Sequence, residues 1–422
     1  MKRIALPRTT IYDVPLLGIV LALLAVGLAM VYSASGIRAL DTRDDPSYFL
    51  VQQSMWAAIG LAGMLVAARI DHRHYRRVAL PLLVVAVGLL ALVLVPGVGT
   101  TAGGASRWLR ISGGVGLQPA ELAKLALILY LAFWLASRRD RVGSASVTAG
   151  FAGLIALVAG LVVAEPDLGT AIVLVMIALC VYFAAGARLA AFGALGLLAV
   201  IATVALAIAQ PYRLQRVLTF LDPWSDPRGA GFQTIQSLYG LALGGPFGEG
   251  LGAGKEKFGF LPASYTDSIF AVIGNELGVL GTGTLILLFL ALAFRGIRIA
   301  LRAPDVEGAL LATGITMWIA LQAWLNMAVV ASLVPMTGIT LPFISYGGSS
   351  LCVGLFAVGI LLSVGKSAAL RGAEEAERLP RAPRGRGDGR AREPAARGRG
   401  GAPRARSGRS APVLWRSPRA RG

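Results

Sequence analysis

Long apolar segments alternate with short polar connections along most of this chain. Ten of them come close to or exceed the roughly 20 apolar residues that a helix needs to cross a bilayer. They lie near residues 14–34, 53–70, 78–96, 119–136, 148–164, 169–187, 190–209, 267–294, 306–331 and 350–366. The pattern predicts an all-α polytopic membrane protein with ten transmembrane helices.

Basic side chains gather in every second connection, which indicates how the helices are oriented. Loops rich in Lys and Arg stay in the cytoplasm, so we expect both termini on the cytoplasmic side. The other side then holds the longest connection, residues 210–266, whose aromatic and apolar residues predict an ordered loop. The basic residues are Lys2, Arg3, Arg8, Arg73, Arg76, Arg77, Arg138, Arg139, Arg141, Arg188, Arg295, Arg298 and Arg302, followed by the arginines of the C-terminal segment.

Composition separates the chain into two parts. The whole chain is 56% hydrophobic and 15% charged, against about 25% charged in soluble domains. Residues 371–422 instead carry 15 arginines and five acidic residues, with few large apolar side chains. We therefore expect a membrane domain over residues 1–370 and a disordered cytoplasmic tail over residues 371–422. The tail suits anionic lipid headgroups better than nucleic acid, and we expect no nucleic-acid partner.

Charged residues at membrane depth are costly, which makes each a candidate functional residue. Glu121 and Lys124 open the segment at 119–136, and their spacing places them on one helix face. They form either a structural ion pair or part of a site. Asp167 lies in the short connection before the next segment, either as an N-cap or as a site residue.

Two further positions flank the outer loops. Asp267 opens the segment that follows the long loop, where partial desolvation raises the pKa of a carboxyl group and suits it to act as a general base. An N-cap is the alternative. Ser345 and Ser349 belong to a Ser- and Gly-rich turn that serves either packing or binding.

Arginines from the outer connections add positive charge beside these carboxyl groups. They are Arg107, Arg213 and Arg216. Guanidinium groups suit phosphate and pyrophosphate. The residues alone therefore predict an outward-facing site for an anionic, lipid-linked substrate. The two histidines share one basic loop and the two cysteines lie in apolar segments, so we expect no metal site built from them.

An ordered set of motifs resembles the SEDS family (shape, elongation, division, sporulation), which includes FtsW, RodA and SpoVE. The stretches 231–237 and 338–342 look more like FtsW than RodA. Glu165, Ala263, Ser268 and Asn275 depart from residues common in the family, which affects substrate contacts rather than Asp267. The matching motifs are Gly104-Ala105-Ser106-Arg107-Trp108, Gln118-Pro119-Ala120-Glu121-Leu122-Ala123-Lys124, Glu165-Pro166-Asp167-Leu168-Gly169-Thr170, Tyr212-Arg213-Leu214-Gln215-Arg216, Asp222-Pro223-Trp224, Gly231-Phe232-Gln233-Thr234-Ile235-Gln236-Ser237, Phe260-Leu261-Pro262, Thr266-Asp267 and Pro342-Phe343-Ile344-Ser345-Tyr346-Gly347-Gly348-Ser349-Ser350.

The resemblance implies a peptidoglycan glycosyltransferase of the bacterial cytoplasmic (inner) membrane, which polymerises lipid II into β-1,4 glycan strands for cell division or shape. Asp267 matches the family's proposed catalytic carboxylate. The expected substrate-binding residues are Arg107, Glu121, Lys124, Asp167, Arg213, Arg216, Ser345 and Ser349, with Arg213 and Arg216 on the leaving pyrophosphate. A class B penicillin-binding protein and other divisome or elongasome proteins are the implied partners. Whether a divalent cation, Mg²⁺ or Mn²⁺, assists the leaving group stays open.

Two alternatives remain at this stage. A lipid II flippase would use the same arginines and would need no general base. A non-catalytic scaffold for the penicillin-binding protein would tolerate the loss of Asp267.

Overall fold

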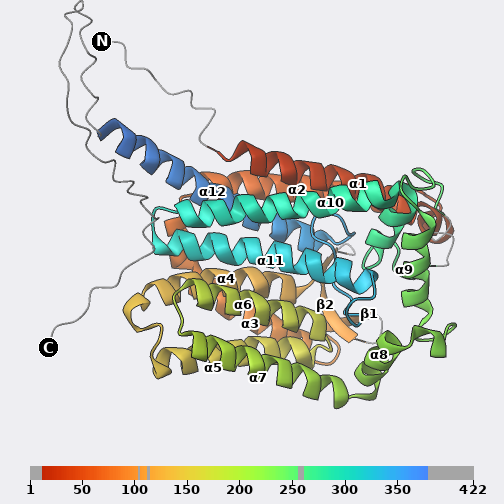
Figure 1. Ribbon diagram of the computed structural model, residues 1–422, viewed down its shortest axis with the longest axis horizontal. Coiled ribbons are helices and arrows are strands. Elements are labelled where there is room, and N and C mark those ends of the chain that lie inside the picture. The colour runs from red at the N-terminus through yellow and green to blue at the C-terminus, as the bar shows by residue number, and fades with distance from the viewer. Residues whose placement is uncertain (1–11, 103–104, 112–114, 255–260, 379–422) are drawn as a thin grey trace, which may run out of the picture. The chain divides into compact units, whose positions relative to one another are not determined.

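The structure is a computed structural model that describes residues 12–102, 105–111, 115–254 and 261–378 (Figure 1). Long helices dominate the described residues and lie side by side. They are α1 (Val14–Arg43), α2 (Tyr48–Arg69), α3 (Arg76–Val93), α4 (Pro119–Ala136), α5 (Ala145–Ala164), α6 (Leu168–Ala184), α7 (Leu189–Ile208), α10 (Ile269–Arg302), α11 (Val306–Val330) and α12 (Gly348–Arg378).

Nine helices within the described residues are long and apolar enough to cross a membrane. The remaining long helix, α6, has 17 residues, the lower limit for a spanning helix. It packs against α4, α5 and α11 in the middle of the bundle. The all-α polytopic fold predicted from the apolar segments is confirmed.

The connections gather at two ends of the bundle (Figure 1). One end, here called the site end, carries the connections after α1, α3, α5, α7 and α11. It includes two short helices, α8 (Pro211–Leu221) and α9 (Phe232–Leu243), joined through the 3₁₀ helix η4 (Pro223–Ser225). About half of the described residues in the predicted ordered loop at 210–266 are therefore helical. The opposite end carries the other connections, including η2 (His72–Tyr75) and η3 (Arg139–Arg141).

A small antiparallel sheet at the site end was not predicted. Strand β2 (Ala105–Ile111) pairs with β1 (Gly99–Ala102) and with β3 (Val115–Leu117). Thr100 lies opposite Trp108, and Leu109 lies opposite Leu117. The Gly pairs between these segments are the available sequence signal, because such pairs favour hairpins.

Several helices extend beyond their predicted ends. α10 reaches Arg302 and α12 reaches Arg378, past the predicted start of the tail at Arg371. The added stretch of α12 is rich in Ala, Glu and Arg, which are strong helix formers. The rest of the predicted tail, residues 379–422, lies outside the described residues, as do Lys2, Arg3 and Arg8.

Helix α10 is broken at Gly278, where φ is +64°. The break lets the loop after α9 pack against the helix, and the Val279 N–H donates to the Gly245 carbonyl at 2.9 Å. A Cβ atom on Gly278 would lie 2.4 Å from the Gly248 nitrogen. Only glycine meets both demands at this position.

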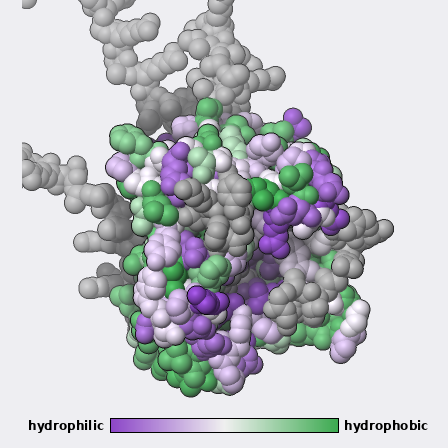
Figure 2. Space-filling view, turned by 90° about the vertical axis from the view of Figure 1, so that its right-hand side faces the viewer, coloured by the Kyte–Doolittle hydropathy of each residue, from purple (hydrophilic) through white to green (hydrophobic). Residues whose placement is uncertain are grey.

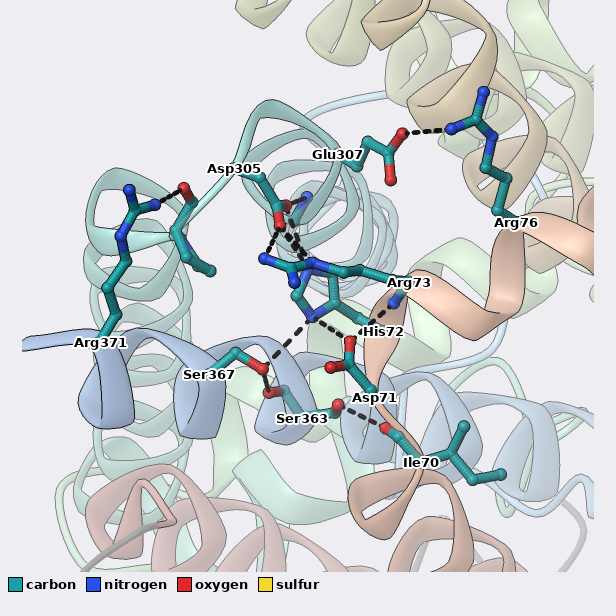
Figure 3. Close-up of polar contacts among 12 residues, drawn as sticks. Ile70, Asp71, His72, Arg73, Arg76, Asp305, Glu307, Ser363, Ser367 and Arg371 are labelled. Carbon is teal, nitrogen blue, oxygen red and sulfur yellow. Dashed lines mark hydrogen bonds and ion pairs between the residues drawn. The ribbon is translucent and has the colours of Figure 1, made fainter. Parts of the chain in front are cut away.

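A polar cluster joins two connections to α12 at the opposite end (Figure 3). His72 is fully buried, and its Nε2 lies 3.0 Å from Asp305 Oδ1. Arg73 pairs with the same carboxylate at 2.9 Å, and Ser363 Oγ donates to the Ile70 carbonyl at 2.6 Å. Although burial acts against it, the hydrogen bond from His72 holds the pKa of Asp305 below its ordinary value. These contacts join η2 to the start of α11 and to α12.

Candidate active site

Asp267 lies at the site end, directly before α10. It lines a narrow cavity of about 10 Å³ together with Gln233, Ser268 and Asn326, about the size of one water molecule. Gly338 closes one side, since a Cβ atom there would lie 3.5 Å from Asp267 Oδ2. Gly338 also has a φ of +74°. Because of this positive φ, any other residue would be strained at this position.

The charge state of Asp267 is set by its surroundings. Burial raises the pKa of its carboxyl group to about 6, and the negative charge of Asp167 acts in the same direction. The positive charges of Arg216 and Arg107 act against this rise. A carboxyl group with a pKa near 6 is mostly ionised at pH 7, yet basic enough to accept a proton, as a general base requires.

The backbone around Asp267 is clamped to the loop between α11 and α12. Asn326 Nδ2 donates to the carbonyl oxygens of Asp267 and Ile339, at 2.8 and 2.7 Å. Ser345 Oγ donates to the Thr266 carbonyl at 2.6 Å. Ser345 also accepts from the Leu341 N–H at 2.8 Å. Its hydroxyl therefore holds the turn, so the packing interpretation fits Ser345 better than substrate contact.

Glu121 and Lys124 form a buried ion pair one layer behind this loop. Lys124 Nζ lies 2.8 Å from Glu121 Oε1 and donates to Gln322 Oε1 at 2.7 Å. Gln322 Nε2 in turn donates to the Thr340 carbonyl at 3.0 Å. The Lys124 ammonium also lies 5.1 Å from the centre of the Trp318 ring. The pair therefore supports the loop that carries Gly338, rather than lining the cavity of Asp267.

A second cavity of about 370 Å³ adjoins that of Asp267, and the two share Gln233, Thr234, Val329 and Met336. Arg216 lines this larger cavity. Its guanidinium donates to the Met336 carbonyl at 3.2 Å and to the Tyr212 hydroxyl, and it lies over the Tyr212 ring. A cation at the wall of a cavity beside Asp267 suits an anionic ligand.

The connection between α5 and α6 adds further charges near Asp267. Asp167 caps α6, because its side chain accepts from the N–H and the hydroxyl of Thr170 at 3.1 and 2.9 Å. Arg107 donates to the carbonyls of Glu165, at 3.2 Å, and of Pro166. Both residues act on Asp267 through their charge while their contacts hold this connection in place.

Glu165 is the unusual residue of this connection. It is buried, and neither carboxyl oxygen has a hydrogen-bond partner among the described residues. Burial raises the pKa of Glu165 to about 8, and the charge of Asp167 acts in the same direction. Glu165 is therefore mostly protonated at pH 7. In this form it carries no charge, as a Gln side chain at this position would carry none.

Two predicted substrate-binding residues lie away from both cavities in the described part of the chain. Arg213 donates to the carbonyls of Val163 and Leu206, at 3.2 and 3.4 Å, and so caps the ends of α5 and α7 instead of facing a ligand. Ser349 donates to the Gly116 carbonyl at 3.0 Å and accepts from the Gln118 N–H. It joins α12 to β3 and α4.

Three residues that shape the site were not predicted as site residues: Gln233, Gln322 and Asn326. The last two are buried and four apart on α11. Two amides at that spacing inside an apolar helix share one face, which was the available signal. Gln233 Nε2 donates to Ser268 Oγ at 3.0 Å, a contact between residues that no sequence pattern connects.

Figure 2 views the molecule from the site end. Hydrophilic side chains gather around a hollow on this face, and hydrophobic side chains lie toward its lower edge. Over the described residues, no group of three or more His, Cys, Asp or Glu side chains is arranged to hold a metal ion.

Comparison with known proteins agrees with this architecture. A family model described as "Cell cycle protein", for FtsW, RodA and SpoVE, matches residues 15–369. The "Probable peptidoglycan glycosyltransferase FtsW" of Trichlorobacter lovleyi is 46% identical, covering 85% of this chain and 94% of that protein. "Stage V sporulation protein E" of Bacillus subtilis is 44% identical, covering 85% of this chain and 98% of that protein.

A solved structure extends the likeness to three dimensions. It is described as "Structural coordination of polymerization and crosslinking by a peptidoglycan synthase complex". A chain in it superposes with a TM-score of 0.69 at 33% identity, covering 85% of this chain and 98% of that one. The present chain therefore belongs to the cell cycle protein family of FtsW, RodA and SpoVE.

Proposed function

We propose that this protein is a peptidoglycan glycosyltransferase of the FtsW kind that polymerises lipid II into β-1,4 glycan strands. One observation carries the proposal most directly. A carboxyl group with a pKa of about 6, that of Asp267, lies beside a cavity of about 370 Å³ lined by Arg216. A general base and a cation on adjoining cavities are what a glycosyl transfer with an anionic leaving group needs.

The proposed reaction is a single displacement. Asp267 takes the proton of the 4-hydroxyl of the acceptor GlcNAc, and that oxygen forms a bond to the anomeric carbon of the donor MurNAc. The bond from this carbon to the pyrophosphate oxygen breaks, and undecaprenyl pyrophosphate leaves with the electron pair. Attack from the opposite face inverts the anomeric centre and forms the β-1,4 bond.

Arg216 is the proposed partner of the leaving pyrophosphate. Its guanidinium lies at the cavity wall and has two described contacts, with Met336 and Tyr212. Removing charge stabilisation of this kind costs about 10²–10³ in kcat in well-studied enzymes. We expect Arg216 to stabilise the charge that develops as the pyrophosphate departs, and the clamp from Asn326 to keep Asp267 facing the cavity.

The described side chains do not fit a resident metal ion. Both oxygens of Asp167 accept hydrogen bonds from Thr170. Asp267 is the one carboxylate among the described residues that line the two cavities. Structural Mg²⁺ and Mn²⁺ sites use several oxygen ligands. A cation that assists the reaction would have to arrive with the pyrophosphate.

The test compares polymerisation of purified lipid II by the full chain, with its transpeptidase partner present, for wild type and Asp267→Asn. Asp222→Asn is the matched control, because Asp222 is an exposed carboxylate of the same outer region that caps η4. We expect long strands from wild type and from Asp222→Asn, and none from a folded Asp267→Asn protein.

Other results assign the protein elsewhere. If folded Asp267→Asn polymerises normally, Asp267 is not the base. If wild type moves lipid II across vesicle membranes without polymerising it, the protein is a flippase. If it makes no polymer and moves no lipid, but activates the transpeptidase, it is a scaffold.

We also propose a partner and an orientation. A class B penicillin-binding protein would crosslink the strands, within the divisome or the elongasome. Basic residues such as Arg73, Arg76 and Arg138 lie at the opposite end, which supports both termini in the cytoplasm and the site end outside the cytoplasmic (inner) membrane. A membrane-impermeant thiol reagent should label Asp226→Cys in intact cells and leave Arg138→Cys unlabelled.

A further inference from the structure

A cavity of about 770 Å³ is formed where α1, α10 and α12 meet. The start of α1 and the end of α10 lie at the opposite end of the bundle from the site end (Figure 1). The cavity is bounded by the start of α1, by the end of α10 and the connection that follows it, and by residues 365–372 of α12. Its volume falls in the range of pockets that hold small ligands. Its described lining residues include four arginines and a single acid, Asp13. The arginines are Arg295, Arg298, Arg302 and Arg371.

The acid is already paired. Asp13 Oδ2 lies 2.6 Å from Arg295, and Asp13 also caps the start of α1. In the described part of the chain, neither Arg298 nor Arg302 has a carboxylate within ion-pair distance. Asp305 pairs with His72 and Arg73 instead, and Glu307 pairs with Arg76 (Figure 3). The cavity wall therefore carries a surplus of positive charge.

The chain's own flanking segments are poor sources of a counter-anion. Residues 1–11 contain no acidic residue. Residues 379–422 contain 13 arginines and two acidic residues. Like charges repel, so neither segment neutralises the arginines. The segment 371–378 holds three acidic residues and two arginines, but none of these acids is among the described residues that line the cavity. An anion from another molecule would therefore complement Arg298 and Arg302.

The surface beside the cavity indicates which kind of molecule. Exposed apolar side chains repeat along one face of α10, at spacings of four, three and four residues. The stripe leads up to the arginines, and the Arg298 guanidinium lies 5.6 Å from the centre of the Phe294 ring. The stripe consists of Leu290, Phe294, Ile297 and Leu301. Adjoining apolar and cationic faces at the end of a membrane helix match the acyl chain and the phosphate of a phospholipid.

We propose that this cavity binds the headgroup phosphate of an anionic phospholipid, with Arg298 and Arg302 on the phosphate and the acyl chains along the apolar stripe of α10. Guanidinium groups suit phosphate because two N–H groups can bind two oxygens at once. The lipid would join α1, α10 and α12 at the end of the bundle that lacks the reaction site. The proposal does not depend on the proposed reaction.

The test measures lipid binding to the purified full chain by native mass spectrometry, with phosphatidylglycerol, phosphatidylcholine and inorganic phosphate as probes. The pocket variant is Arg298→Gln/Arg302→Gln. The matched control is Arg138→Gln/Arg141→Gln, which removes the same charge from exposed arginines in the connection after α4. We expect wild type and control to bind phosphatidylglycerol alike, and the pocket variant to bind it about thirtyfold more weakly.

A melting measurement checks that each variant is folded. If the double variant is not, Arg302→Gln alone is used, because Arg302 is exposed and its loss should weaken binding about fivefold. Equal binding by wild type and the pocket variants would overturn the proposal, as would equal loss in pocket variant and control. Equal affinity for phosphatidylcholine would also overturn it, and displacement of the lipid by inorganic phosphate at matching affinity would indicate a soluble-phosphate site instead.

Discussion

Replacing Lys124 with methionine tests how the buried ion pair supports the site. The change keeps an unbranched side chain of similar length and removes the charge. Lys124 is 1% exposed and Glu121 is 4% exposed. Without Lys124, the Glu121 carboxylate and the Gln322 amide oxygen lose a donor at 2.8 and 2.7 Å. Leaving one partner of a buried pair uncompensated costs about 3–5 kcal/mol.

The double variant Glu121→Gln/Lys124→Met separates charge from packing. It removes both charges, so the desolvation cost disappears together with the attraction, and buried pairs replaced in this way are often neutral in stability. We expect the double variant to be more stable than Lys124→Met by about 2 kcal/mol. Glu121→Gln alone should cost less than Lys124→Met, because Lys124 keeps Gln322 and the Trp318 ring.

Thermal unfolding in detergent is the assay, followed with a thiol-reactive dye. Cys180 and Cys352 are free and partly buried, so unfolding exposes them to the dye. Polymerisation should fall in Lys124→Met even below its melting temperature, because Gln322 and the Thr340 carbonyl that it holds lose their support. A double variant that melts no higher than Lys124→Met would refute the electrostatic reasoning.

Three further results follow from the geometry of the site. Because Asp267 must be ionised to act as a base and burial raises its pKa to about 6, kcat/KM should rise from pH 5 to pH 7 and level off above; a flat profile would exclude this carboxyl group as the base. Asn326→Leu removes two hydrogen bonds that position Asp267 and its neighbouring loop. In steady-state kinetics, kcat should fall roughly tenfold or more while KM stays constant. A change confined to KM would contradict this role for Asn326. Burial raises the pKa of Glu165 from 4.5 to about 8, so the folded state loses stability as pH rises between these values. Glu165→Gln should therefore stabilise the protein by up to about 3 kcal/mol at pH 7 and not at pH 4. Melting curves at both pH values test this.

The local pattern of the sequence was enough for the architecture. Apolar segments of bilayer length leave the chain few options, because each backbone polar group in lipid must be bonded within its own helix. The position of Asp267 at the start of a helix after the long outer loop followed from the same pattern. So did the pairing of Glu121 with Lys124, since residues three apart on a helix share a face.

Tertiary structure alone decided which polar residues line a cavity. Arg213 and Arg216 lie three apart in one short helix, yet Arg213 caps the ends of α5 and α7 while Arg216 lines a cavity. Their sequence context is nearly the same; the neighbouring helices differ. Asn326, which donates to the Asp267 carbonyl, and Gly338, which lines the same cavity, lie 59 and 71 residues further along the chain than Asp267. Contacts at such separations depend on how helices pack, which periodicity within one helix does not encode.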